Sequence, residues 1–294
     1  MHGQTESSSF AKVVVIGAGT MGHGIAQVCA AADYPTTLFD IEQDFVDRGL
    51  ARVQKNLDKG VKRGKVSEAQ RDATLAKLSG SADFDAALAG AELVIEAVPE
   101  KIELKQKLFQ DATRVAGEGV LLATNTSSLS IAKIASAVAK PERVIGTHFF
   151  NPVHIMKLLE IVVGPQTGED ALAAIQAFGA RLGKTCVTVR DSPGFATSRL
   201  GLVIGLEAIR MVEEGVASPA DIDTAMCLGY GFPMGPLRLT DLVGLDVRLS
   251  IADYLSEHLE NGAHFKPPAL LRQMVADGKL GKKVGQGFYS WESK

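Results

Sequence analysis

The chain has 294 residues, of which 46% are hydrophobic and 22% are charged, and its formal net charge is −3. This length lies near the ~250–300 residues at which a single core stops growing, so two domains are expected. The slightly acidic balance gives no basic field for nucleic acid, and no apolar run reaches the ~20 residues of a membrane span, so neither partner is predicted.

Strands and helices alternate along the first two thirds of the chain. Apolar runs predict strands at 12–16, 36–39, 93–97, 120–124, 144–149, 158–163 and 186–189. Helical periodicity predicts helices at 24–32, 45–63, 67–78, 102–116 and 170–182. The second and third helices form a hairpin, and Ser67 followed by Gln70 predicts a capping box. This alternation predicts a Rossmann-like, doubly wound, mostly parallel sheet with a helical hairpin insertion.

Beyond residue 191 the strand patterns stop and helical periodicity continues. The expected helices cover 195–214, 220–228, 239–259 and 268–277. We therefore predict an α/β domain at 1–190 and an all-α domain at 191–294.

A glycine-rich turn links the first strand to the first helix. It reads Gly17-Ala18-Gly19-Thr20-Met21-Gly22, the G-x-G-x-x-G pattern. Alone this pattern is weak, but between a strand and a helix it predicts a dinucleotide site. Gly17 permits the tight turn, Gly19 lets the backbone approach a pyrophosphate, and Gly22 lets helix and strand pack closely. Thr20 and Met21 are expected beside the cofactor, whose phosphates the helix N-terminus favours.

Asp40 ends the second strand, about 20 residues after the glycines. A carboxylate there binds the adenosine ribose hydroxyls and repels a 2′-phosphate, and no arginine directly follows it. We therefore predict NAD as the cofactor. The alternatives left open are FAD binding by the same fold and a plain packing role for the glycines.

The stretch VIGTHFFNPVHIMKLLEI, from Val144 to Ile161, reads as two short apolar strands. Each strand carries one titratable residue, His148 and Glu160 respectively. A carboxylate beside an imidazole holds one tautomer and stabilises the charged form, so this pair predicts a general acid–base. With a hydride-carrying cofactor, it predicts an alcohol dehydrogenase. The alternatives are a hydrogen-bonded core histidine and a surface carboxylate.

Several long motifs follow one another: VVIGAGTMGHGIAQ, VIEAVPE, ATNTSSLSI, GTHFFNPVHIMKLLEIV, DSPGF, DIDTAMCLGYGFPMGPLRLTDLVGLD and GKKVGQGFY. In this order they resemble the 3-hydroxyacyl-CoA dehydrogenase family, in particular its 3-hydroxybutyryl-CoA dehydrogenase type, from about residue 12 to residue 289. The resemblance implies reversible oxidation of an L-(3S)-3-hydroxyacyl-CoA to a 3-ketoacyl-CoA with NAD, on short acyl chains.

The resemblance also implies roles for individual residues. His148 takes the substrate hydroxyl proton, Glu160 stabilises the imidazolium, and Ser127 hydrogen-bonds the reacting oxygen. Further matches are Asn125 near the nicotinamide, Asn151 near the catalytic histidine, and Glu100 and Lys105 near the cofactor. The alternatives are turn and cap roles for the polar loop residues and a solvated helix charge for Lys105.

Two positions depart from the family pattern. Ser198 stands where an asparagine is expected after DSPGF, and His154 stands where proline is more common. A serine still offers a donor and an acceptor but is shorter, so Ser198 is counted as a catalytic-site residue whose effect is open. Losing a preorganised donor at a reacting oxygen costs about 2.7–4 kcal/mol of transition-state stabilisation. His154 is expected to be a local variant without a role.

A basic helix face follows the first two strands. Lys55, Lys59 and Arg63 recur at a spacing of four residues and therefore share one face, flanked by Arg52 and Lys62. The resemblance implies that this hairpin contacts the coenzyme A phosphates of an acyl-CoA substrate. A solvated charged face is the alternative.

Assembly and location follow from composition and resemblance. The apolar helices after residue 191 exceed the needs of their own core, and the family dimerises there, so a homodimer is expected. Cys29, Cys186 and Cys227 lack metal or disulfide spacing and are expected to be small buried hydrophobes. No metal site is predicted. Residues 1–9 lack the apolar core of a signal peptide, and a cytoplasmic location is expected.

Two other functions stay open. One is a related NAD-dependent dehydrogenase that acts on a hydroxy acid without coenzyme A, such as a sugar acid or carnitine. The other is a dinucleotide-binding protein without turnover. Ser198 favours the first of these, whereas His148 and Glu160 oppose the second.

Overall fold

The computed structural model describes residues 10–291. The prediction that residues 1–9 carry no signal peptide therefore lies outside the described residues. Contacts between Cα atoms divide the chain into two units, Met1–Asp191 and Ser192–Lys294.

The first unit is built on one eight-stranded sheet in the order β3-β2-β1-β4-β5-β6-β7-β8. Its strands are β1 (Val13–Ile16), β2 (Thr36–Phe39), β3 (Leu78–Ser81), β4 (Leu93–Glu96), β5 (Leu121–Thr124), β6 (Val144–Phe149), β7 (Leu158–Val163) and β8 (Thr185–Arg190). Neighbours are parallel except β6 and β7, which pair antiparallel. The strand order reverses between β1 and β4, where open α/β sheets bind ligands. The expected Rossmann-like, doubly wound sheet is confirmed.

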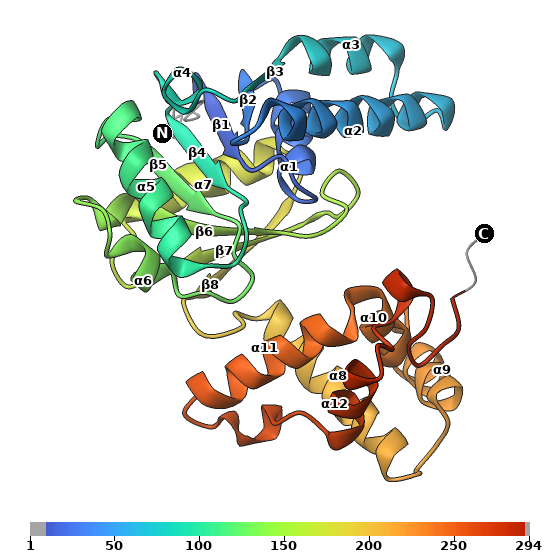
Figure 1. Ribbon diagram of the computed structural model, residues 1–294. Helices are drawn as coiled ribbons and strands as arrows, with labels where there is room; N and C mark the ends of the chain where they lie inside the picture. Colours follow the sequence, from blue (N-terminus) through green and yellow to red (C-terminus); the bar gives the residue numbers. More distant parts are fainter. Residues whose placement is uncertain (1–9, 292–294) are drawn as a thin grey trace, which may run out of the picture. The chain divides into compact units, whose positions relative to one another are not determined.

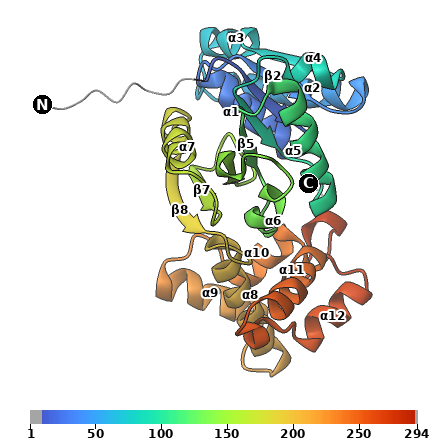
Figure 2. The same cartoon turned by 90° about the vertical axis from the view of Figure 1, so that its left-hand side faces the viewer.

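Helices cover both faces of this sheet. They are α1 (Gly22–Ala31), α2 (Gln43–Lys62), α3 (Glu68–Ala76), α4 (Phe84–Leu88), α5 (Ile102–Ala116), α6 (Ile131–Ala135) and α7 (Glu169–Arg181), with the 3₁₀ turn η1 (Pro141–Arg143). Figures 1 and 2 show α5 and α7 on opposite sides of the strands. The residues of β1, β4, β5 and β6 are all buried, as expected for strands covered on both faces.

The α2–α3 hairpin begins its second helix with the predicted capping box. The Ser67 hydroxyl accepts the Gln70 N–H at 3.1 Å, and the Gln70 side chain accepts the Ser67 N–H at 2.8 Å. The helix predicted to reach Leu78 ends at Ala76, and β3 follows. The segment Leu78–Ser81 lacks the alternation of apolar and polar residues that predicts a strand. It pairs only with β2, at the edge of the sheet, so its strand conformation depends on that neighbour. Short α4 and α6 were also not predicted, since five residues carry little periodicity.

The second unit, as far as residue 291, contains helices and short turns without a strand. It holds α8 (Thr197–Glu213), α9 (Pro219–Tyr230), α10 (Pro236–Val243), α11 (Leu245–His258), α12 (Ala269–Ala276) and the 3₁₀ turns η2 (Gly262–Phe265) and η3 (Lys282–Val284). The single helix predicted for 239–259 is two helices, because Gly244 has a φ of 105°, outside the helical range. No helix among residues 10–291 is long and apolar enough to cross a bilayer.

The three cysteines are free thiols. Cys29 is fully buried in α1, and burial raises the pKa of its thiol. Cys186 and Cys227 are only half-buried, so the expectation of burial is wrong for these two.

Candidate active site

Polar side chains gather where the parallel strands end. The glycine turn follows β1, Glu96 ends β4, Asn125 follows β5, and His148 lies near the end of β6. The carboxyl ends of parallel strands share one edge of a sheet, so these groups belong to one region of the first unit.

The glycine turn has the geometry of a phosphate-binding loop. Gly17 has a φ of 101°, and a Cβ atom there would lie 2.9 Å from the Ala97 carbonyl oxygen. A Cβ atom on Gly22 would lie 1.6 Å from the Gly17 carbonyl oxygen, so only glycine fits at the start of α1. A Cβ atom on Gly19 would meet nothing within 4 Å. The turn is therefore closed on its protein side and open at Gly19, as pyrophosphate binding requires.

The carboxylate of Asp40 stabilises this turn through two backbone hydrogen bonds. Its Oδ2 accepts the Ala18 N–H at 2.7 Å, and its Oδ1 accepts the Ile41 N–H at 2.8 Å. The carboxylate thus lies beside the glycine turn, where its charge suits ribose hydroxyls and disfavours a 2′-phosphate. Thr20 is exposed at the open edge, and Met21 is partly buried against the core.

His148 and Glu160 face each other across the antiparallel strands β6 and β7. They are direct cross-strand partners, and His148 Nδ1 lies 2.8 Å from Glu160 Oε2. The histidine is 8% exposed and the glutamate is fully buried, so Glu160 is not a surface carboxylate. An ionised carboxylate only accepts hydrogen bonds, so Nδ1 carries the proton and Nε2 is the basic nitrogen of the neutral ring. The Phe150 ring, 4.4 Å away between centroids, flanks the imidazole.

A second charged cluster joins β4, α5 and the loop after β5. Lys105 Nζ lies 2.7 Å from Glu96 Oε1 and 3.1 Å from Glu100 Oε2. The lysine is 1% exposed and Glu96 is fully buried. The alternative of a solvated charge for Lys105 is therefore wrong.

Glu100 extends this cluster to Ser127. Its Oε1 accepts the Ser127 N–H at 2.8 Å and the Thr126 hydroxyl at 2.7 Å, with the Ser127 hydroxyl 3.4 Å away. Glu96 also accepts the Thr124 hydroxyl at 2.7 Å. A continuous charged network thus fixes the serine loop. The sequence prediction omitted Glu96, although a single carboxylate in an apolar strand is the signal that identified Glu160.

The loop between β6 and β7 is also held in place. Lys184 Nζ donates to the Met156 carbonyl at 2.7 Å and to the Val153 carbonyl. Burial lowers the pKa of Lys184. Val153 packs on α1, where a Cβ atom on Gly24 would come within 3.0 Å of it. The sequence prediction did not include Lys184, because nothing local marks a lysine that binds carbonyls 28 to 31 residues away.

The remaining predicted residues differ in how well the structure places them. Asn125 Oδ1 accepts the Phe149 N–H at 2.9 Å and so ties the β5 loop to the strand of His148. Asn151 is exposed, and no described hydrogen bond joins it to His148. Ser198 lies in the first turn of α8, in the second unit.

The basic face predicted on α2 is present. Lys55, Lys59 and Arg63 are exposed, opposite the buried side of the helix formed by Val53 and Leu57. Within residues 10–291 none of the three basic side chains forms an ion pair. Their charge is thus not neutralised by the described part of the chain.

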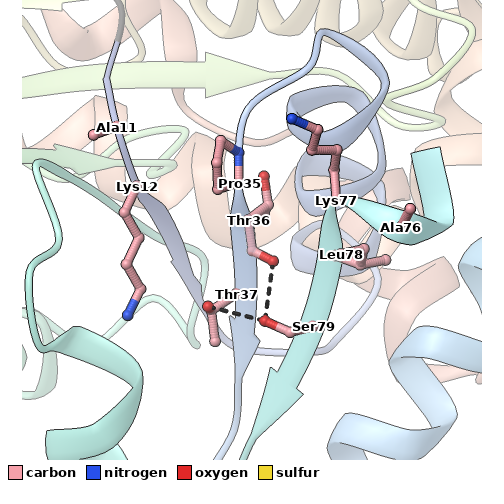
Figure 3. A pocket seen from close by; sticks show the side chains of 9 residues that line it. All are labelled: Ala11, Lys12, Pro35, Thr36, Thr37, Ala76, Lys77, Leu78 and Ser79. Atoms are coloured by element: carbon pink, nitrogen blue, oxygen red, sulfur yellow. Dashed lines mark hydrogen bonds between the residues drawn. The ribbon is translucent and has the colours of Figure 1, made fainter. Parts of the chain in front are cut away.

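A separate cavity of about 360 Å³ lies at the opposite edge of the sheet. Figure 3 shows it at the amino ends of β1, β2 and β3, between Lys12, Thr36 and Leu78. It contains none of the predicted site residues. The chemistry expected of the chain therefore belongs to the carboxyl edge.

Comparison with known proteins assigns both units. Residues 12–192 match the family described as 3-hydroxyacyl-CoA dehydrogenase, NAD binding domain, and residues 194–291 match its C-terminal domain. The chain is 43% identical to a 3-hydroxybutyryl-CoA dehydrogenase of Mycobacterium tuberculosis, over 97% of this chain and 100% of that protein. It is 40% identical to the human mitochondrial hydroxyacyl-coenzyme A dehydrogenase, over 98% and 95% of the two chains. The crystal structure of (S)-3-hydroxybutyryl-CoA dehydrogenase from Ralstonia eutropha superposes with a TM-score of 0.93 at 41% identity, covering 97% and 100%.

Proposed function

Because this chain belongs to the 3-hydroxyacyl-CoA dehydrogenase family, we propose that His148 and Glu160 are its catalytic acid–base pair. The chain is an NAD-dependent oxidoreductase that acts on a 3-hydroxyacyl-CoA. The observation that carries the pair is the 2.8 Å contact between a nearly buried imidazole and a fully buried carboxylate.

The roles of the side chains follow from this geometry. When bound, NAD accepts the hydride that leaves C3 of the substrate. His148 takes the hydroxyl proton at Nε2, while Nδ1 keeps its bond to Glu160. The buried carboxylate then stabilises the imidazolium. The Ser127 hydroxyl donates to the reacting oxygen, and Glu100 orients the loop that carries it.

The cofactor is proposed to lie along the carboxyl edge of the sheet. The amides around Gly19 hold the pyrophosphate, and Asp40 holds the adenosine ribose. Gly17 and Gly22 shape that turn, with Thr20 at its open edge and Met21 partly buried beside it. Glu100, Lys105 and Asn125 are proposed to line the nicotinamide end.

The substrate is proposed to be a short-chain 3-hydroxyacyl-CoA such as 3-hydroxybutyryl-CoA, because the similar bacterial proteins carry that name. Lys55, Lys59 and Arg63 would bind the coenzyme A phosphates, since these cations have no ion-pair partner among residues 10–291. Ser198 is proposed to lie at the substrate, which it reaches directly or through a water, and Asn151 is proposed to lie near His148. A homodimer formed through the second unit and a cytoplasmic location remain predictions.

The test is the oxidation of NADH, followed by its near-ultraviolet absorbance, with acetoacetyl-CoA as substrate and NADPH in parallel. Turnover with NADH but not with NADPH supports both the reaction and the role of Asp40. Folded protein that binds NADH without turnover would contradict the proposal and favour a substrate without coenzyme A or a non-catalytic role. Replacing Lys59 and Arg63 with alanine should raise KM, whereas Lys107→Ala, an exposed α5 lysine that pairs with Asp111, is the matched control.

A further inference from the structure

The charged cluster at the ends of β4 and β5 holds more negative than positive charge. Lys105 Nζ lies 2.7 Å from Glu96 Oε1 and 3.1 Å from Glu100 Oε2, so a single ammonium group serves two carboxylates. In the described part of the chain no other cation pairs with either glutamate. One ammonium group cannot neutralise two carboxylates, so the cluster keeps one negative charge.

This surplus charge lies at Glu100 rather than at Glu96. Glu96 is fully buried, and besides the ammonium group its oxygens accept the Val98 N–H and the Thr124 hydroxyl, each at 2.7 Å. Three donors thus satisfy its charge. The Glu100 side chain is 40% exposed and lies farther from the ammonium group. Glu100 is therefore the member of the cluster whose charge can act on a bound molecule.

The glycine turn directs a dinucleotide toward this cluster. Gly17 lies directly against the end of β4, since a Cβ atom there would come within 2.9 Å of the Ala97 carbonyl oxygen. In the sheet, β2 borders β1 on one side and β4 borders it on the other. A dinucleotide with its adenosine at Asp40, after β2, and its pyrophosphate at the turn therefore continues to the ends of β4 and β5. We expect its nicotinamide ring near Glu100.

The reaction moves a positive charge along this edge of the sheet. The ring of NAD⁺ is positively charged, and it becomes neutral when the hydride arrives from C3 of the substrate with its electron pair. The hydroxyl proton passes to His148 Nε2, so the positive charge ends on the imidazole that Glu160 contacts. His148 lies on β6, two strands from β4 or about 10 Å. Glu100 and Glu160 thus act at opposite ends of this movement.

We propose that the surplus charge at Glu100 makes the cofactor site favour the oxidised nicotinamide over the reduced form. The inference rests on the proposed function, which places the nicotinamide at this edge. Glu100 stabilises the positive charge before the hydride moves, and Glu160 stabilises it afterwards. Removing either carboxylate alone would shift the equilibrium between bound reactants and products, in opposite directions.

The experiment measures the Kd of NAD⁺ and of NADH with the purified full-length protein at low ionic strength, by calorimetry and by NADH fluorescence. Glu100→Gln removes the charge but keeps an oxygen that can accept the Ser127 N–H. The ratio of the Kd of NAD⁺ to that of NADH should rise about tenfold, and the Kd of NADH itself should change by less than about threefold. A tenfold effect lies between those of a unit charge ~4 Å away in water and near a protein surface.

Two variants separate the charge from other effects of the substitution. Glu100→Asp keeps the charge, so its ratio of Kd values should stay within about threefold of the wild-type ratio. Glu118→Gln is the matched control, because it removes the same charge from an exposed glutamate that pairs with Lys140 beyond the carboxyl end of α5. That position is about 20 Å along the helix from Glu100, so the ratio should not change.

A ratio of Kd values that Glu100→Gln leaves unchanged overturns the inference. Weaker binding of NAD⁺ and NADH by the same factor also overturns it, since Glu100 would then serve only to position the Ser127 loop. The binding constants do not depend on turnover. A wild-type protein that turns over no thioester, acetoacetyl-CoA included, would therefore overturn the proposed function separately.

Discussion

The two units satisfy their buried carboxylates in different ways. In the first unit, Glu96 is bonded by Lys105 and Glu160 by His148, so each carboxylate has an ionisable side-chain partner from a separate element. In the second unit, Asp223 and Asp241 accept mainly backbone N–H groups. Both arrangements meet the requirement that buried polar groups be hydrogen-bonded. The first arrangement joins ionisable side chains to one another, whereas the second uses carboxylates to fix the path of the chain.

The largest expected effect comes from removing the base of the first unit. His148→Asn should lower kcat by about 10³-fold, within the range for a general acid–base, and leave NADH binding in place. Stopped-flow turnover and a fluorescence titration with NADH would measure the two quantities. His264→Asn, in the second unit, is the control. A loss of less than tenfold would show that another group acts as the base.

Breaking the second charged pair should lower stability. Glu96→Gln leaves Lys105 with Glu100 alone, and loss of one partner of a buried pair costs about 3 kcal/mol of the free energy of unfolding. The network would loosen around Ser127, so kcat should fall more than KM rises. Urea unfolding and steady-state kinetics measure both. Stability equal to that of Thr124→Val, which removes only one hydroxyl bond to Glu96, would contradict this account.

The corresponding change in the second unit should alter stability alone. Asp241→Asn would set an amide N–H₂ against N–H donors from Phe288, Tyr289 and Trp291. The free energy of unfolding should fall by about 2 kcal/mol, the value of lost charged hydrogen bonds, with kcat unchanged at temperatures where the protein is folded. Thermal unfolding and turnover would show this. A fall in kcat with normal stability would mean that the two units do not differ in this way.

The smallest effect concerns His154, on the loop after β6. His154 is exposed, and its pKa is lowered from 6.5 first by partial desolvation from its neighbours and then by the charges of His23 and Lys184. The unfolded chain therefore binds this proton more readily, so the contribution of His154 to stability is lost as pH falls below about 6.5. Between pH about 7.5 and about 5, the Tm of His154→Asn should fall less than that of the wild type, by about 1 °C. Identical pH profiles would contradict the assignment.

The sequence predicted most of the fold, because its strongest signals are local. The glycine turn, the apolar strands and the His148–Glu160 spacing each lie within a short segment, and the structure has them. Strand β3 was not predicted, because it is defined by pairing with β2. The partners of Glu96 and Lys184 were not predicted either, because they come from other elements. Glu96 bonds Lys105 of α5, and Lys184 bonds the Val153 and Met156 carbonyls, contacts that only the tertiary structure supplies.

The pairing of β6 with β7 has a consequence for how this chain can vary in length. His148 stands directly opposite Glu160 in the ladder, and side chains alternate between the two faces of a sheet. One residue added to or removed from either strand would turn one member of the pair to the other face. Residues added at the tip of the connection, around residue 155, would leave both strands in register. Changes in chain length are therefore tolerated only in the connection, residues 150–157, and not within the two strands that hold the pair.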